Sequence, residues 1–155
     1  MLKNCRIVIT GAAGTLGQAT AKAARDKGAE VIGLDVVETE TLHQVDQYYR
    51  VDLLDRAATA DCIASLGNFD GLINIAGGFA MGMEAAESSD EQWEWMFKIN
   101  VQTLRNTVIA AVPVFKSQRR GKIVNIGALG ALSGGAAMSA YCCAKSSVMR
   151  LTESL

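Results

Sequence analysis

The chain has 155 residues, of which 50% are hydrophobic and 20% are charged, and its formal net charge is -1. This composition predicts one globular domain with a core and excludes a disordered chain. The charge offers no basic excess for binding nucleic acid. The longest mostly apolar stretch, residues 108–115, is far short of the ~20 residues that span a membrane.

Strands and helices are expected to alternate along the sequence. Short apolar runs predict five strands, at residues 6–9, 30–34, 48–51, 71–75 and 122–126. Longer segments predict helices at residues 15–27, 54–66 and 90–117, and from residue 139 to the last residue. This alternation predicts an α/β fold, a doubly wound parallel sheet. The sheet is expected to be Rossmann-like, which implies the strand order 3-2-1-4-5.

The long helix over residues 90–117 carries local signals of its own. Ser89 and Gln92 have the spacing of a capping box at its start. Pro113 should kink the helix or mark its last turns, because proline removes a helical hydrogen bond.

The segment Thr-Gly-Ala-Ala-Gly-Thr-Leu-Gly, residues 10–17, lies between the first strand and the first helix. Glycines there allow a tight turn and a close approach of the backbone to a pyrophosphate, and the helix N-terminus supplies N–H groups. Three glycines alone also fit an ordinary turn, but this position favours a dinucleotide site. The predicted cofactor contacts in this loop are Gly11, Gly14, Leu16 and Gly17.

Two aspartates follow the next two strands. Asp35 closes the second strand, 18 residues after Gly17, where a carboxylate is expected to meet the hydroxyls of the adenosine ribose. No arginine or lysine lies between Gly11 and Leu16 or directly after Asp35 to bind a 2′-phosphate, so NAD is favoured over NADP. Asp52 ends the third strand and could cap the next helix, accept a hydrogen bond from the adenine amine, or do both.

Metal chemistry is not predicted. The cysteines are Cys5, Cys62, Cys142 and Cys143, and neither they nor the single histidine, His43, have metal-ligand spacing. Free thiols in a reducing cytoplasm are the expected state, and the first residues lack the pattern of a secretory signal, so a cytoplasmic protein is predicted.

The predicted chemistry lies on the last helix, where Tyr141 and Lys145 stand four residues apart and share a face. An unperturbed phenol, with a pKa of about 10, is a poor acid–base group at neutral pH. A nearby ammonium group and an oxidised nicotinamide would lower that pKa. Tyr141 could then exchange a proton with a substrate oxygen while a hydride moves.

With these motifs together, the sequence resembles the short-chain dehydrogenase/reductase family over essentially its whole length. Asn-Ile-Ala-Gly at residues 74–77 stands where that family usually has Asn-Asn-Ala-Gly, and Trp93 and Asn100 match the family's tryptophan and asparagine on the fourth helix. The resemblance implies that Tyr141 is the acid–base, that Lys145 also holds the nicotinamide ribose, and that Asn100 positions a water that relays protons.

The resemblance implies further contacts and an assembly. Cofactor contacts are expected from Leu53, Ala76 and Gly77, as well as from Tyr141 and Lys145. The expected partners are a small-molecule substrate and further copies of the chain, in a homo-oligomer formed through the long fourth helix and the last helix. No nucleic acid and no membrane is expected among the partners.

The sequence departs from the family pattern at three places. Its glycine spacing matches the longer, sugar-nucleotide-modifying branch, whereas the segment 74–77, Trp93 and Asn100 match the compact branch. Ile75 replaces an asparagine, so the local support of the sheet must differ. Ala128 occupies the position of the catalytic serine, 13 residues before Tyr141, and the loss of one such donor typically slows an enzyme by ~10²–10³.

Several hypotheses follow from Ala128. Ser133 or Ser139 could replace the missing hydroxyl, or the substrate could be electrophilic enough to need none. Dihydropteridine reductases, which reduce a quinonoid dihydropterin with NADH, are loosely similar and carry alanine at that position.

The main hypothesis is an NAD(H)-dependent oxidoreductase acting on a carbonyl, an alcohol or a quinonoid substrate. The alternatives are a non-catalytic NAD-binding protein and a sugar-nucleotide epimerase or dehydratase.

Residues 1–155 are expected to form a single domain that is incomplete at its C-terminal end. The family has a sixth strand beside the fifth, whereas this sequence stops within the last predicted helix. Without that neighbour, the apolar strand at residues 122–126 would be an open sheet edge, which favours aggregation or pairing with another chain.

Overall fold

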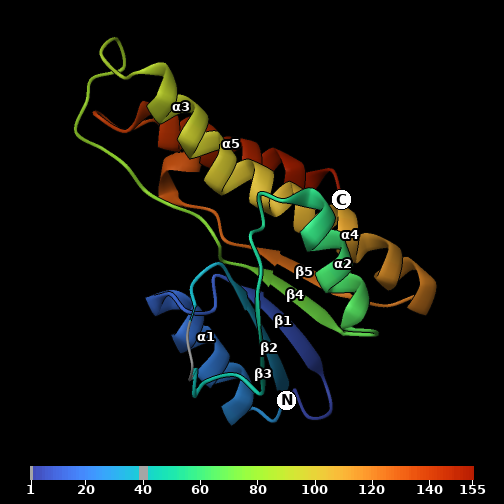
Figure 1. Cartoon of the computed structure of the whole chain (residues 1–155). Coiled ribbons are helices and arrows are strands. Elements are labelled where there is room, and N and C mark those ends of the chain that lie inside the picture. Colours follow the sequence, from blue (N-terminus) through green and yellow to red (C-terminus); the bar gives the residue numbers. More distant parts are fainter. Residues whose placement is uncertain (1, 39–41) are drawn as a thin grey trace.

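The computed structural model describes residues 2–38 and 42–155. Five parallel strands form one sheet in the order β3-β2-β1-β4-β5, as predicted (Figure 1). In chain order the strands are β1 (Arg6–Thr10), β2 (Glu30–Asp35), β3 (Gln47–Arg50), β4 (Gly71–Asn74) and β5 (Lys122–Asn125). The sheet reverses its order between β1 and β4, which in open α/β sheets is the place where a ligand binds.

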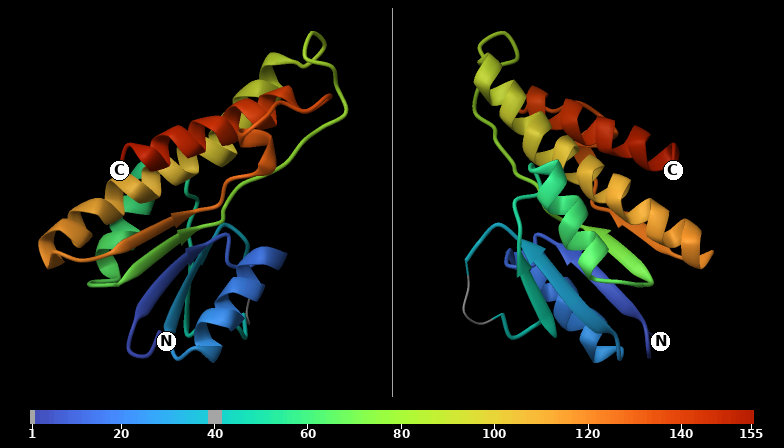
Figure 2. Two further views of the ribbon diagram at one scale, coloured as in Figure 1. Left: turned by 180° about the vertical axis from the view of Figure 1, so that it is seen from behind. Right: turned by 45° about the vertical axis from the view of Figure 1, so that its right-hand side comes forward.

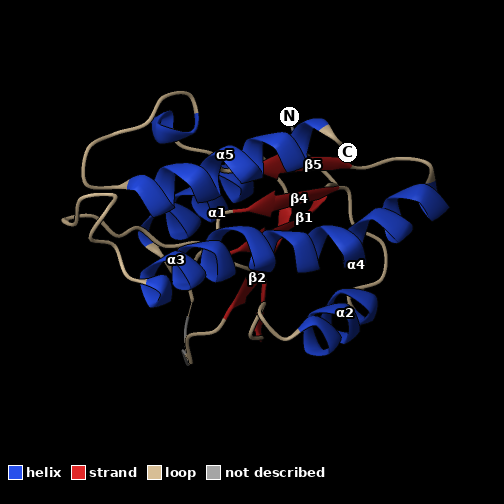
Figure 3. Cartoon of the chain, turned by 90° about the horizontal axis from the view of Figure 1, so that it is seen from above, coloured by secondary structure: helices blue, strands red, loops and turns tan. Residues whose placement is uncertain are grey.

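The helices cover both faces of the sheet unequally. Figures 1 and 2 show α1 (Thr15–Asp26) alone on one face and the remaining helices on the other. Those remaining helices are α2 (Arg56–Ser65), α3 (Asp90–Phe97), α4 (Thr103–Gln118) and α5 (Ser139–Glu153). Seen from above, α3 and α4 run almost end to end and α5 lies alongside them (Figure 3). None of the helices in residues 2–38 and 42–155 has the length and hydropathy needed to cross a lipid bilayer.

The core forms because successive side chains of a strand point to opposite faces. On β1, Val8 is buried in the cluster under α2 and α4, whereas Ile7 and Ile9 are buried in the cluster under α1. Small buried residues of α1, such as Ala21 and Ala24, allow that helix to pack closely on the sheet. Each strand in the middle of the sheet therefore contributes to two hydrophobic layers.

The predicted long helix is divided by a π turn. Residues Lys98–Gln102 adopt this wider turn between α3 and α4, and Asn100 lies within it. Ser89 caps α3 as predicted, with its hydroxyl accepting a 3.3 Å hydrogen bond from the backbone N–H of Gln92. Pro113 lies inside α4, which ends at Gln118, so the proline marks the last turns of this helix, one of the two predicted outcomes.

Two predicted helix boundaries were wrong. The second helix begins at Arg56, not at residue 54, and its cap is Asp55, whose side chain accepts a hydrogen bond from Ala58 N–H. Asp52 does not cap this helix, because it lies too early and accepts a hydrogen bond from Leu54 N–H within the preceding turn. The last helix ends at Glu153, two residues before the end of the sequence.

Candidate active site

A cleft of about 840 Å³ runs along the edge of the sheet where the strands end. It is lined by the residues that follow each of the five strands, and by residues of α1, α3, the π turn, α4 and α5. The structure brings every predicted catalytic and cofactor-binding residue to this one cleft: Gly11, Gly14, Leu16, Gly17, Asp35, Asp52, Leu53, Ala76, Gly77, Asn100, Tyr141 and Lys145.

The glycine loop forms one wall of the cleft, and its glycines have different reasons to be glycine. Gly11 has a φ of +67°, and a Cβ on it would lie 2.8 Å from the backbone nitrogen of Ala76. A Cβ on Gly17 would lie 2.0 Å from the carbonyl oxygen of Gly11. Gly14 has an ordinary φ of -71°, and the nearest atom to its Cβ would be 3.4 Å away. The fold therefore requires Gly11 and Gly17, but it does not require Gly14.

The N-terminus of α1 opens onto this part of the cleft. Its first turn contains no acidic side chain, and no side chain caps its N–H groups. These N–H groups and the positive end of the helix dipole suit an anion such as a pyrophosphate.

Asp35 connects the end of β2 to the glycine loop. One carboxylate oxygen accepts a 2.9 Å hydrogen bond from Ala13 N–H, and the other accepts bonds from the N–H groups of Val36 and Val37 at 2.7 and 3.3 Å. These bonds fix the carboxylate at the wall of the cleft, where the sequence predicts a ribose contact.

A basic residue near Asp35 was missed in the sequence. Arg50 is the partner of Asp35 in the register of β2 and β3, although it comes 15 residues later in the chain. Its guanidinium donates to a carboxylate oxygen of Glu38 and to the carbonyl oxygen of Val36, both at 3.2 Å. Only the sheet register brings Arg50 to this place, so a scan of neighbouring residues could not find it.

The segment after β4 is held by two side chains from other elements. The buried hydroxyl of Thr10 accepts hydrogen bonds from Ile75 N–H and Ala76 N–H at 3.1 and 3.2 Å. A Cβ on Gly77 would lie 2.7 Å from the amide oxygen of Asn100, so any larger residue there would displace the buried Asn100 side chain. Ile75, which replaces the family's asparagine, packs against the core under α1, so packing supports the sheet there.

Asn100 is buried, and protein groups satisfy its side chain. The amide nitrogen donates to the carbonyl oxygens of Gly78 and Met96, both at 3.0 Å, and the amide oxygen accepts a 3.2 Å bond from Gly78 N–H. Asn100 therefore holds the segment after β4 against the π turn. Both the nitrogen and the oxygen of its side-chain amide are hydrogen-bonded to protein groups.

Tyr141 and Lys145 lie together on α5 at the β5 end of the cleft. The ammonium nitrogen of Lys145 lies 5.9 Å from the centre of the Tyr141 ring and donates a 3.0 Å hydrogen bond to the carbonyl oxygen of Ile126. Burial lowers the pKa of Lys145. The pKa of Tyr141 is raised, mainly by burial and to a smaller extent by the charge of Cys142. The protein alone thus does not give Tyr141 the lowered pKa that the sequence analysis expects.

The position expected for a catalytic serine follows β5 and leads into a short helix. Ala128 has an extended backbone and precedes the short helix η2 (Leu129–Ala131). In the described part of the chain, the cleft is lined by none of Ala128, Ser133 and Ser139, so a substitute hydroxyl from either serine stays a hypothesis.

Several cleft residues were not predicted. Trp95, Ile99 and Thr103 stand four residues apart and line the cleft together, a helical spacing that could have revealed them. Phe79 follows the glycines after β4, and its ring lies edge-on to that of Tyr141, with the ring centres 4.8 Å apart and an angle of 84°. A lone phenylalanine in a predicted loop gave no signal of this contact.

Known proteins share this sequence pattern and architecture. The model of the short chain dehydrogenase family matches residues 6–155. The chain is 32% identical over 162 residues to the short chain dehydrogenase adrF of Penicillium rubens, an alignment that covers 100% of this chain and 64% of that protein. It is 35% identical over 144 residues to the short chain dehydrogenase andC of Emericella variicolor, covering 87% of this chain and 57% of the relative.

A solved structure shares the fold. NAD⁺-bound xylitol dehydrogenase superposes with a TM-score of 0.94 at 24% identity, covering 99% of this chain and 64% of that one. The chain thus spans less than two thirds of the length of the relatives it matches. The family match over residues 6–155 and the shared architecture lead to one conclusion: this chain belongs to the short-chain dehydrogenase family.

Proposed function

We propose that this chain forms the NAD(H)-binding and catalytic part of an oxidoreductase. The reaction is hydride transfer between NAD(H) and a carbonyl, an alcohol or a comparably electron-poor group. The observation that carries the proposal is the single cleft that joins the carboxylate of Asp35 to the Tyr141 and Lys145 pair. The dehydrogenase names of the relatives and the NAD⁺ bound by xylitol dehydrogenase support it.

The residues along the cleft fit a dinucleotide. The pyrophosphate would lie at Gly14 and the uncapped first turn of α1, which supply N–H groups and no opposing negative charge. Asp35 would accept hydrogen bonds from the adenosine ribose. Contacts to the rest of the cofactor would come from Leu16, Asp52, Leu53, Ala76, Gly77 and Lys145.

The bound nicotinamide supplies or accepts the hydride, and the protein handles the proton. Tyr141 gives a proton to the substrate oxygen in reduction and takes one in oxidation. Because burial raises the pKa of Tyr141, the phenolate needs positive charge nearby. Lys145 provides that charge at 5.9 Å from the ring and would also hold the nicotinamide ribose.

Asn100 has a positioning role in this proposal. Its side-chain bonds fix Gly78 and the π turn, so a proton-relaying water would bind to the backbone of that turn. Such turns depart from the regular hydrogen-bond ladder of a helix and frequently occur at functional sites.

The test is binding of NADH, followed by turnover with carbonyls and a quinonoid dihydropterin in the active protein. Tyr141→Phe should remove most turnover while leaving the Kd for NADH nearly unchanged. A variant that keeps its kcat would show that Tyr141 is not the acid–base. Binding of NADH with no turnover of any substrate would favour the second candidate, a non-catalytic NAD-binding protein.

Ala128 is the specific observation behind this second candidate. If the missing hydroxyl limits the reaction, Ala128→Ser should raise the turnover of ordinary ketones more than that of activated substrates. A third candidate, a sugar-nucleotide epimerase or dehydratase, depends on the glycine spacing of residues 11–17, and binding of a nucleotide sugar would support it.

A further inference from the structure

We propose that the substrate carries fused or bulky apolar rings, and that Phe79 binds them next to Tyr141 and so determines which substrates reach the phenol. This inference rests on the proposed function, because it concerns the substrate end of the same cleft. It goes further by assigning a substrate class and a specificity-determining residue.

Phe79 lies against Tyr141 and is largely exposed. Its ring packs edge-on against the Tyr141 ring at 4.8 Å, yet 57% of the residue remains exposed. The backbone just before it is fixed, because both the N–H and the carbonyl group of Gly78 are bonded to Asn100. Phe79 therefore follows a fixed backbone segment and packs against the proposed acid–base. More than half of the residue stays exposed and can contact a ligand.

The loop that follows Phe79 also exposes apolar side chains. Met81 and Met83 are 56% and 40% exposed, so apolar side chains occupy alternate positions from residue 79 to residue 83. Between them, Gly82 N–H donates a 2.9 Å hydrogen bond to the carbonyl oxygen of Ala137, just before α5. This bond ties the apolar loop to the segment that leads into Tyr141. Neither methionine lines the cleft itself, but exposed apolar surface that continues from a cleft residue such as Phe79 often marks a binding site.

The cleft wall near Tyr141 has few polar side chains. The residues that line this end are Phe79, Ile126, Gly127, Tyr141 and Lys145. The phenol and the ammonium group are already engaged in the proposed reaction, and the other side chains at this end carry no polar group. A polyol would leave its hydroxyls without partners here, which costs binding free energy. A ring system would instead bury apolar surface against Phe79.

The structure allows a clean test, because the large exposed fraction of Phe79 means that removing it should not unfold the protein. First, NADH binding is measured by the fluorescence of the reduced nicotinamide. The protein is then loaded with NAD⁺, which has no hydride to give to a ketone, and is titrated with three ketones: bicyclic 2-decalone, monocyclic cyclohexanone and the polar dihydroxyacetone. The expected affinity falls in that order.

Phe79→Ala should weaken 2-decalone binding by about tenfold, the effect of losing one aromatic contact surface, and should weaken cyclohexanone less. Leu132→Ala is the matched control, since Leu132 is 71% exposed and does not line the cleft; it should leave all three affinities unchanged. Dihydroxyacetone binding as tightly as 2-decalone, or unchanged 2-decalone binding in Phe79→Ala, would overturn the inference alone. Failure of NADH to bind would overturn the proposed function itself.

Discussion

The ammonium group of Lys145 donates a 3.0 Å hydrogen bond to the carbonyl oxygen of Ile126, which joins α5 to the end of β5. Lys145 is only 7% exposed, and burial lowers its pKa because the charged form has lost its hydration. The protein thus keeps a positive charge at the cleft wall at the expense of stability, a pattern typical of functional sites.

Lys145→Met should remove most hydride transfer without lowering the melting temperature. The apolar side chain keeps the packing and no longer buries a charge. The sign of the pH effect follows from the lowered pKa: the burial cost is present below the folded-state pKa and disappears as Lys145 deprotonates above it. Any gain in Tm over the native protein should therefore be largest near neutral pH and shrink as the pH rises.

Melting curves at several pH values check this prediction, with Lys145→Ala as the control that leaves a cavity and should melt lower. A Lys145→Met protein that melts well below the native one at neutral pH would show that the ammonium group stabilises the fold instead.

Much of this fold could be predicted because its signals are local. The apolar runs of β1, β2 and β4 and the alternation of elements were enough to predict the parallel sheet, and the Rossmann-like interpretation supplied its strand order. The site residues at the ends of these strands were also accessible, since parallel strands end at one edge of a sheet. The start of α2 was not, because Asp52 and Asp55 are both plausible caps and only the backbone path decides between them.

Features that depend on tertiary contacts could not be predicted. Arg50 approaches Asp35 only through the register of β2 and β3, and Phe79 meets Tyr141 only when the loop after β4 reaches α5. Within the π turn, Asn100 likewise bonds Gly78, which lies 22 residues earlier in the chain. In each case the partners lie many residues apart in the sequence.

Cofactor preference should depend on Asp35 and on the charges around it. Asp35→Ala should weaken NADH binding by about tenfold to a hundredfold, the effect of losing hydrogen bonds to a charged acceptor. Val36→Arg should improve NADPH binding relative to NADH. Glu38→Gln should do so more weakly, because it releases Arg50 from its ion pair.

The measurement is a pair of Kd values for NADH and NADPH in each variant. Asp61→Asn, an exposed carboxylate on α2, is the control and should change neither. Tighter binding of NADPH than of NADH by the native protein would contradict the proposed NAD preference.

Gly14 and Gly17 should respond differently to alanine. Gly17→Ala should lower the melting temperature sharply, because its Cβ would collide with the carbonyl oxygen of Gly11 at 2.0 Å. Gly14→Ala should fold normally, since its Cβ has room and its φ is ordinary, but should bind NADH more weakly if the pyrophosphate lies against it. Gly134→Ala, in open space, should change neither property. Native NADH affinity in Gly14→Ala would place the pyrophosphate elsewhere.

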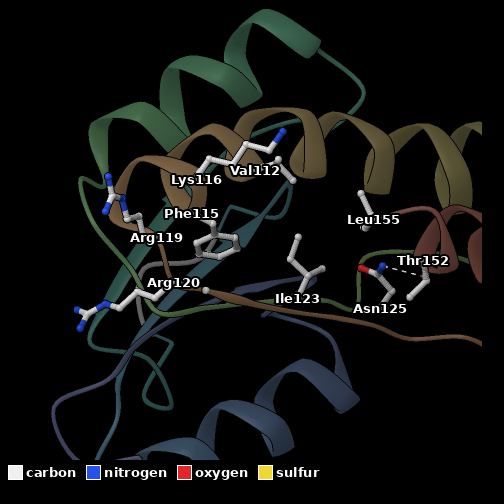
Figure 4. A pocket seen from close by; sticks show the side chains of 10 residues that line it. Val112, Phe115, Lys116, Arg119, Arg120, Ile123, Asn125, Thr152 and Leu155 are labelled. Carbon is white, nitrogen blue, oxygen red and sulfur yellow. Dashed lines mark hydrogen bonds between the residues drawn. The ribbon is translucent and has the colours of Figure 1, made fainter.

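The free edge of β5 leads to the last prediction. Among the described strands β5 has a neighbour on one side only, and Val124 on it is 49% exposed. Beside it lies a hollow of about 510 Å³ between α4, β5 and the end of α5, which is lined by apolar side chains such as Phe115 and Ile123 (Figure 4). An unpaired strand edge next to apolar surface is a template for association.

A protein made of residues 1–155 should therefore self-associate and melt at a low temperature. Val124→Lys should reduce this association, because a charge on an edge strand opposes pairing. Ala60→Lys, on the exposed face of α2, adds the same charge elsewhere and should have no effect. Light scattering and sedimentation at several concentrations measure the outcome.

If instead Ile109→Lys, on the exposed side of α4, disperses the assembly and Val124→Lys does not, the helices form the interface, as the family resemblance implies. A monodisperse native protein with a sharp melt and full activity would contradict both forms of the prediction.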